Sequence, residues 1–421
     1  MATNIRQHWR ELTSPQRNAF IACFLGWALD AFDFFVLTYC ISAIAADFHV
    51  GVKEVTEALF WTLVMRPVGA LLFGALAEKI GRRPTLMINI VSFCVFEVAS
   101  GFAPTLRSLL VCRALFGIAM GGEWGVGAAL AFETLPEKNR GFFSGLLQEG
   151  YVVGNLLAAT VYGLLFSHLP GIGSGMLTNW RLMFFIGAAP AILVFYIRSK
   201  VAESPAFLAG QSRAVKPSLN FGDVMRYLPT FLFLVLLMTA FTSFSHGTQD
   251  LYPTFLQKSK GFAPERVGWV SDVGHIGALL GGITFGTLSE RWGRRRCIVI
   301  AALLAIPMIY IWAFTFEPIV VAAGGFLMQF MVQGAWGIIP AHLNELSPAA
   351  VRATFPGVAY QLGNLLSSRN GPLQASLSTK YFKGNLGPVL AMTVIVVSIA
   401  VSLLAGFGRE AKGQSMTTIA D

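Results

Sequence analysis

The chain has 421 residues, of which 55% are hydrophobic and only 13% are charged, and its formal net charge is +9. About a quarter of the residues of a soluble globular protein are charged, so this composition excludes a water-soluble domain and predicts a polytopic membrane protein. The positive charge does not indicate a nucleic-acid partner, because the basic residues lie in short loops between apolar segments.

Twelve apolar segments are long enough to cross a hydrocarbon core of ~30 Å, which needs roughly 20 residues of helix. They are 18–46, 55–78, 84–103, 106–132, 141–167, 181–198, 228–256, 263–289, 296–315, 319–344, 353–377 and 386–408. The polar stretch in the middle predicts three parts: an N-terminal six-helix bundle (1–198), a cytoplasmic central loop (199–227) and a C-terminal six-helix bundle with a short cytoplasmic tail (228–421).

An even number of spans places both termini on one side of the membrane. The segments on that side hold twenty Lys and Arg residues and the opposite segments hold eight. Because Lys and Arg accumulate in cytoplasmic loops, we expect both termini to be cytoplasmic, in a plasma membrane or a bacterial inner membrane. The lipid bilayer is therefore the expected surrounding, and no obligate protein partner is evident.

The two halves of the chain repeat one another. "GALAEKIGRR" (74–83) recurs as "GTLSERWGRR" (286–295), an offset of 212, and "GEWG" (122–125) recurs as "GAWG" (334–337) at the same offset. "GNLL" occurs at 154 and again at 363, after a three-residue shift. One register that extends across several spans predicts two homologous six-helix bundles.

The repeated loops predict a gate. We expect Gly74 and Gly286 to permit close packing of helix ends, and Gly81 and Gly293 to turn the loop. Ion pairs worth ~0–1 kcal/mol each when partly solvated would suit an interface that opens and closes. The expected gating residues are Glu78, Arg82, Glu133, Arg140, Glu290, Arg294, Glu345 and Arg352. The alternative is that the loop charges only determine topology.

Charges inside the spans do not obey the repeat. When the two halves are aligned at offset 212, each of these charged residues corresponds to an uncharged one: Asp30 to Thr242, Asp33 to Ser245, Arg66 to Ala278, Arg113 to Gly325 and Glu123 to Ala335. Ionisable groups near the bilayer centre are costly and are usually functional or paired. Each of these residues occurs in one half only, and we therefore interpret them as functional rather than structural residues.

Asp30 and Asp33 lie three residues apart, on one face of the first span. Two close carboxylates in a low dielectric cannot both ionise cheaply, so at least one should hold a transferable proton. Arg113 is the expected counter-ion, and a static Asp–Arg bridge is the alternative. Glu123 is a candidate for the inner proton path, whereas Glu97 is interpreted as peripheral or packing-related.

Arg66 lies about mid-depth in the second span, in "LVMRPVGALLFG". Its guanidinium stays charged and offers a planar fork that matches a carboxylate, so we expect it to bind a substrate anion. Neutralisation of Asp30 or Asp33 is the alternative.

The stretch "FTSFSHGTQDLYPTF" (241–255) puts His246 and Asp250 four residues apart on one helix face, with Gln249 adjacent. Imidazole changes charge near physiological pH, and Asp250 would stabilise its protonated form. His246 could then bind a carboxylate while it carries the co-transported proton. Pro253 is expected to kink the helix above.

Three resemblances sharpen these expectations. The two loop copies, G-x-L-x-E-[KR]-x-G-R-R, resemble the signature of the major facilitator superfamily, which implies two bundles that rock about a central site. Asp33 and Arg113 match the aspartate–arginine pattern of proton-coupled sugar porters. "S-H-x-T-Q-D-x-x-x-T" resembles the signature of fungal lactate/pyruvate:proton permeases, which group with the sialate:proton symporters, although Thr242 replaces an expected asparagine. In that group an eleventh-helix Gln-x-x-Asn corresponds to Gln361 and Asn364.

The predicted function is proton-coupled symport of a small organic anion, with lactate or pyruvate as the leading substrates. Sialate or a di- or tricarboxylate is the alternative, and a proton-driven exporter or a transporter-like sensor is less well supported. The expected proton-coupling residues are Asp30, Asp33, Arg113, Glu123, His246 and Asp250, and the expected substrate contacts are Arg66, His246, Gln249, Gln361 and Asn364. No residue spacing predicts a catalytic site, a cofactor or a metal.

Overall fold

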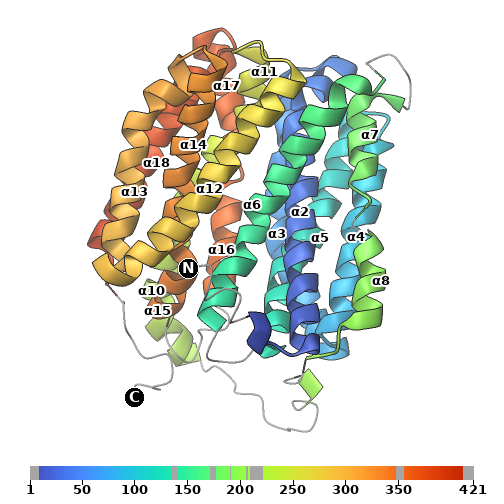
Figure 1. Cartoon of the computed structure of the whole chain (residues 1–421), viewed down its shortest axis with the longest axis vertical. Helices are drawn as coiled ribbons and strands as arrows, with labels where there is room; N and C mark the ends of the chain where they lie inside the picture. The colour runs from blue at the N-terminus through green and yellow to red at the C-terminus, as the bar shows by residue number, and fades with distance from the viewer. Residues whose placement is uncertain are drawn as a thin grey trace.

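The computed structural model describes residues 9–134, 140–170, 177–189, 191–204, 207–208, 221–347 and 355–410. Within these ranges the regular elements are all helical. Figure 1 shows the helices of the first half and those of the second half as two neighbouring groups, with most helices along the long axis. The arrangement is the twelve-helix, two-bundle fold that the sequence predicts.

The first bundle is built from helices that begin and end close to the predicted spans. They are α2 (Ser14–Asp47), α3 (Val52–Ile80), α4 (Arg82–Gly101), α5 (Leu106–Thr134), α6 (Arg140–Leu165) with η2 (Phe166–His168), α7 (Asn179–Ile186) and α8 (Ala191–Lys200).

The second bundle contains more interruptions. Its elements are α10 (Phe221–Gln249), α11 (Tyr252–Lys258), α12 (Pro264–Trp292), α13 (Arg294–Ile309), η4 (Tyr310–Phe314), α14 (Pro318–Trp336), α15 (Ile339–Leu346), α16 (Phe355–Ser367), α17 (Asn370–Phe382) and α18 (Gly387–Phe407). The helix predicted from residue 228 begins at Phe221, seven residues earlier, inside the stretch expected to be central loop.

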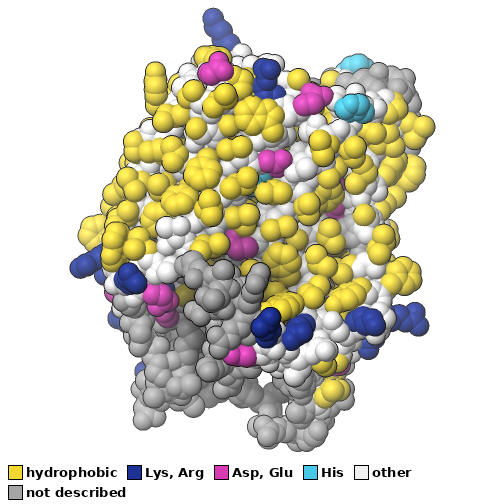
Figure 2. Space-filling view, in the orientation of Figure 1, with side chains coloured by type: hydrophobic (Ala, Val, Ile, Leu, Met, Phe, Trp, Pro, Cys, Tyr) yellow, Lys and Arg dark blue, Asp and Glu magenta, His cyan; other side chains and the backbone are white. Residues whose placement is uncertain are grey.

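Ten helical stretches among the described residues are long and apolar enough to cross a membrane. The other two spans are α12, which carries Glu265 and Asp272, and the α16–α17 pair, which is interrupted at Ser368–Arg369. On the face shown in Figure 2, hydrophobic side chains cover a broad band, and Lys and Arg side chains gather mainly beyond its lower edge. The protein is therefore a multi-pass membrane protein.

The two halves resemble each other in helix packing as well as in sequence. A side chain at any of four glycines would collide with the facing helix, and the four contacts form two pairs at offset 212. In the first pair, a Cβ on Gly69 would meet Ile118 and a Cβ on Gly281 would meet Phe330. In the second pair, a Cβ on Gly122 would meet Phe73 and a Cβ on Gly334 would meet Phe285. The same close helix approach has thus been kept in both bundles.

The repeated loops, 74–83 and 286–295, lie at one end of the molecule, which we call the loop end; the other is the far end. Gly81 and Gly293 have φ angles of 104° and 95°, so they turn the loop as predicted. The expectation for Gly74 is wrong: a Cβ on Gly74 would meet no atom within 4 Å, so its lack of a side chain does not serve helix packing.

Both loops are also closed by a carboxylate from outside the repeated motif. Glu203 accepts hydrogen bonds from the backbone N–H groups of Arg82 and Arg83, at 3.0 and 3.2 Å. Glu410 accepts the equivalent bonds from Arg294 and Arg295, at 3.2 and 3.1 Å. Each carboxylate satisfies free amides at a helix N-terminus, where negative charge is favoured.

The bundles close on one another towards the far end. Gly163 of α6 meets Gly268 of α12 so closely that a Cβ on Gly163 would lie 2.9 Å from the Gly268 Cα. Beside this contact the Thr160 hydroxyl donates to Asp272 Oδ2 at 3.0 Å. The Gln257 amide donates to the carbonyl oxygen of Tyr39 at 3.1 Å, and Figure 1 shows α6 and α12 side by side. This end of the bundle interface is sealed.

We expect Gly293→Ala to destabilise the protein, because a residue with a side chain in this backbone region costs about 1–3 kcal/mol. The melting temperature of the detergent-purified protein should fall. Gly74→Ala is the matched control: it lies inside α3 in open space, and alanine favours a helix over glycine. Equal melting temperatures for the two variants would contradict the role assigned to the Gly293 turn.

Candidate functional site

Six ionisable residues of the first bundle are almost completely removed from solvent. All have 0 or 1% of their surface exposed. They are Asp30 and Asp33 on α2, Arg66 on α3, Glu97 on α4, and Arg113 and Glu123 on α5. Such groups are costly in a membrane interior unless they are paired or functional.

Arg113 is paired with Glu97, not with Asp33. Its Nη1 lies 2.5 Å from Glu97 Oε2, and both side chains have 0% exposure. The Arg113 guanidinium also lies 3.9 Å from the centre of the Phe116 ring. The interpretation of Glu97 as peripheral is therefore wrong, because it supplies the counter-charge of a buried arginine.

Asp33 lies close to this pair without a hydrogen-bond partner in the described part of the chain. A Cβ at Gly187, at the break between α7 and α8, would be 2.7 Å from Asp33 Oδ1 and 2.8 Å from Glu97 Cγ. Glu123 packs in the same way against Gly26 of α2. Glycines thus make room for both acids.

The cluster contains more negative than positive groups. Arg66 and Arg113 remain charged, whereas four carboxyl groups, those of Asp30, Asp33, Glu97 and Glu123, lie among them. With every group ionised, four negative and two positive charges would be enclosed. Two bound protons would balance the charges.

Arg66 lies within electrostatic range of the Asp30 carboxyl group but forms no hydrogen bond with it. Its three guanidinium nitrogens are buried, and none has a hydrogen-bond partner among the described residues. Its Cζ lies 5.7 Å from the centre of the Tyr360 ring of α16, in the other bundle. A buried cation is expensive unless an anion joins it, so the arrangement suits a bound carboxylate.

Tyr360 and Tyr151 frame the centre from opposite bundles. Tyr151, on α6, lies in the electrostatic range of Arg66, Tyr360 and Asp250. The two tyrosines are equivalent in the three-residue-shifted register, as "YVVGNLL" (151–157) and "YQLGNLL" (360–366). The repeat thus contributes one aromatic hydroxyl from each side, a pairing that the search at offset 212 did not find.

His246 and Asp250 form the pair that the sequence suggested. His246 Nδ1 lies 3.1 Å from Asp250 Oδ1, and both side chains are buried. The His246 ring packs edge-on against Phe34 of the other bundle, with ring centres 5.8 Å apart. α10 ends at Gln249 and α11 begins at Tyr252, so Asp250 lies at a helix break just before Pro253.

The predicted amides form two short chains. The Gln249 amide donates to Gln329 Oε1 at 2.8 Å, and the Asn364 amide donates to Gln361 Oε1 at 3.3 Å. Gln249 Oε1 and Asn364 Oδ1 are buried without a partner in the part of the structure that is described. Asn364 has a counterpart in the first half, since in the shifted register it matches Asn155.

The gating residues can be placed in the second half. Arg294 Nη2 lies 2.6 Å from Glu290 Oε1 and 3.1 Å from Glu345 Oε1. Arg294 and Glu345 are 7% and 8% exposed, so this pair is more buried than expected. In the first half Arg82 Nη1 donates to the Ala77 carbonyl oxygen at 3.0 Å. The side chains of Glu78, Glu133, Arg140 and Arg352 lie outside the described residues.

A sequence profile described as the Major Facilitator Superfamily matches residues 23–368. The chain belongs to the Major Facilitator Superfamily. It is 30% identical over 396 residues to a yeast (Saccharomyces cerevisiae) protein named as a carboxylic acid transporter homolog, a match that covers 88% of this chain but 63% of the longer yeast protein. The Escherichia coli sialic acid transporter NanX is 28% identical over 416 residues, 96% of this chain and 97% of NanX.

The fold comparison agrees with this assignment. A partially occluded, inward-open structure of the xylose transporter XylE from E. coli superimposes with a TM-score of 0.77 at 17% identity, covering 96% of this chain and all of that one. Like these Major Facilitator Superfamily relatives, the chain is a transporter and not an enzyme.

We expect Glu97→Ala to destabilise this transporter strongly, since removal of one partner of a buried ion pair costs about 3–5 kcal/mol. Thermal unfolding in detergent measures the effect. Glu57→Ala is the control, because Glu57 pairs with Arg369 at 3.2 Å on an exposed surface, where a pair is worth about 0–1 kcal/mol. Similar losses in the two variants would show that Arg113 finds another partner, Asp33 being the nearest candidate.

Proposed function

We propose that the protein is a proton-coupled symporter of a small monocarboxylate such as lactate or pyruvate, working by alternating access. The observation that carries the proposal is Arg66, a fully buried guanidinium whose nitrogens have no hydrogen-bond partner in the described structure. It faces Tyr360 of the opposite bundle, so a carboxylate bound there would contact both bundles. A substrate that joins the bundles can bias their relative movement.

The His246–Asp250 pair supports proton coupling. It places an imidazole and a carboxylate, two groups that can pass a proton, 3.1 Å apart inside the protein. The first-bundle cluster, with four carboxyl groups around two arginines, supplies further proton-binding groups. Entry of an anion beside Arg66 and of a proton at the acids would keep the enclosed charge balanced.

The number of available cations favours a monocarboxylate over a di- or tricarboxylate. Arg113 is engaged by Glu97, which leaves Arg66 as the one buried central arginine without a hydrogen-bond partner in the described residues. A second substrate carboxylate would have no equivalent cation. Sialic acid, which carries one carboxylate, is the second candidate, and the similarity to the NanX transporter supports it.

We also propose that the loop end is cytoplasmic and that the far-end contacts separate when the transporter opens outward. The excess of Lys and Arg in the loop-end segments supports this orientation. The Arg294–Glu345 pair would then belong to the cytoplasmic gate.

The function is tested with the purified protein in liposomes. An inward proton gradient should drive accumulation of labelled lactate or pyruvate above equilibrium, and an uncoupler should abolish it. Labelled sialic acid in parallel vesicles tests the second candidate. Uptake of every substrate that is indifferent to the gradient would refute proton symport.

Asp250→Asn should abolish gradient-driven accumulation, because the amide cannot stabilise a protonated His246. Exchange of labelled for unlabelled substrate across the membrane, which needs no net proton movement, should persist. Glu317→Gln, which changes an exposed acidic residue at the start of α14, is the control and should accumulate substrate normally. Accumulation by Asp250→Asn at the level of the unmodified protein would remove the pair from the coupling mechanism.

Arg66→Lys should raise the apparent KM about tenfold, because the lysine ammonium keeps the charge but cannot donate two parallel hydrogen bonds to one carboxylate. The maximal rate should change less than the KM. Initial rates over a range of substrate concentrations separate the two parameters. An unchanged KM would exclude Arg66 from substrate recognition.

A further inference from the structure

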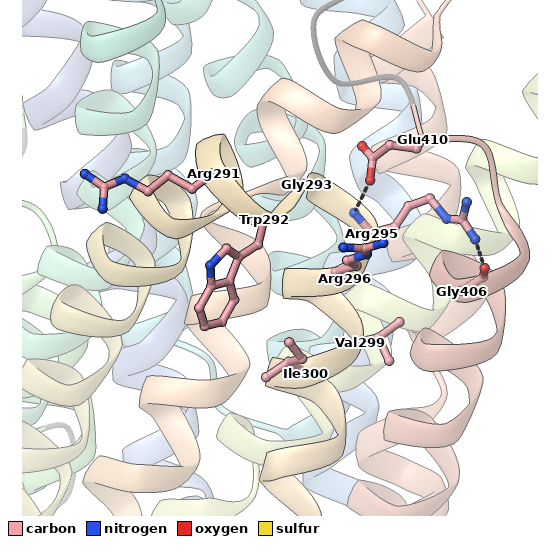
Figure 3. Close-up of a pocket in the computed structure, with 9 residues that line it drawn as sticks. All are labelled: Arg291, Trp292, Gly293, Arg295, Arg296, Val299, Ile300, Gly406 and Glu410. Carbon is pink, nitrogen blue, oxygen red and sulfur yellow. Dashed lines mark hydrogen bonds between the residues drawn. The ribbon is translucent and has the colours of Figure 1, made fainter.

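A cavity of about 650 Å³ opens at the loop end, away from the central site. Figure 3 shows it between the end of α12, the start of α13 and the end of α18. Its lining residues are Arg291, Trp292, Gly293, Arg295, Arg296, Val299, Ile300, Gly406 and Glu410. Neither the gating residues nor the substrate residues discussed above line it.

The polar side of the cavity is positively charged. It holds three arginines against one carboxylate, and that carboxylate, Glu410, is engaged by the amides of Arg294 and Arg295. The Arg295 guanidinium donates to the carbonyl oxygens of Ala405 and Gly406. Arg296 is exposed and has no hydrogen bond or ion pair to the residues that the structure describes. The site therefore suits an anion.

The equivalent place in the first half is different. There Glu203 closes the loop as Glu410 does, but Phe207 lies against it: the Arg82 Cζ is 5.3 Å from the centre of the Phe207 ring. At offset 212 Arg296 falls on Pro84, so the third arginine has no counterpart. The loop structure alone does not require either the cavity or Arg296.

The other side of the cavity is apolar and exposed. Trp292 and Ile300 are 52% and 36% exposed, and in Figure 3 both side chains lie on the same side of the loop. Arg296, Ile300, Leu303 and Leu304 follow one another at helical spacing, and all are exposed. One face of α13 thus begins with a cation and continues with apolar side chains into the membrane-spanning part.

We propose that this cavity binds an anionic phospholipid. The phosphate lies beside Arg296, the Trp292 indole lies at the headgroup level, and an acyl chain follows Ile300 and Leu303 along α13. Tryptophan is enriched at the membrane interface, and basic pockets between membrane helices bind lipid headgroups. A free anion would use the arginines but not the apolar face, so the exposed stripe favours a lipid.

The test uses the full-length protein in detergent, with phosphatidylglycerol or phosphatidylcholine added and the bound lipid measured by native mass spectrometry. Phosphatidylglycerol should bind more tightly than phosphatidylcholine. Arg296→Ala should weaken phosphatidylglycerol binding about fivefold, the effect expected of one basic residue near an anionic headgroup. Arg296→Lys should restore most of the binding, and Ile300→Ser should weaken both lipids.

Lys79→Ala is the matched control, since Lys79 is exposed at the position equivalent to Arg291 in the first-half loop. It removes one positive charge and should leave lipid binding unchanged. An equal loss in Lys79→Ala and Arg296→Ala would reduce the effect to overall charge and overturn the proposal. Displacement of the lipid by equimolar inorganic phosphate would also overturn the proposal. Much tighter lipid binding by a chain that ends at Glu410 would overturn it too, because the chain's own tail would then be the occupant of the cavity.

Discussion

A charged group that is buried away from water needs a partner of opposite charge, and the centre of this transporter depends on this constraint. Arg113 meets the constraint internally, through Glu97 at 2.5 Å. Arg66 lies within electrostatic range of Asp30, but its guanidinium nitrogens have no hydrogen-bond partner within the described structure. Under the proposed function, this difference lets Arg113 stabilise the bundle and leaves the Arg66 nitrogens available to a substrate anion.

The central site combines a symmetric frame with asymmetric chemistry. Both bundles keep the same glycine contacts between helices, the same positive-φ loop glycines and the same carboxylate at the start of the following helix. The centre adds a matched tyrosine from each bundle, Tyr151 and Tyr360. Arg66 and the His246–Asp250 pair each occur on one side only. In the function we propose, the unmatched groups bind the substrate and the proton.

The loop end also combines features repeated in both halves with features found in one half. Glu203 and Glu410 close the two loops in the same way. The second loop is followed by a third arginine, Arg296, where the first has Pro84, and a cavity lies there beside an apolar helix face. The repeated part is explained by the geometry of a helix N-terminus. The unrepeated part has the chemistry of a headgroup site, at the edge of the molecule rather than at its centre.

The sequence by itself determined the fold class, the internal repeat and most members of the site, because apolar length, a constant offset and charges inside spans are all local signals. His246 and Asp250 were predictable for that reason: they lie four residues apart on one helix. Only the tertiary structure decided which acid neutralises Arg113, since Glu97 and Asp33 lie on different helices and sequence spacing says nothing of how those helices rotate about their axes. The place of Tyr360 over Arg66 was likewise decided by packing, because it depends on how two separate bundles meet.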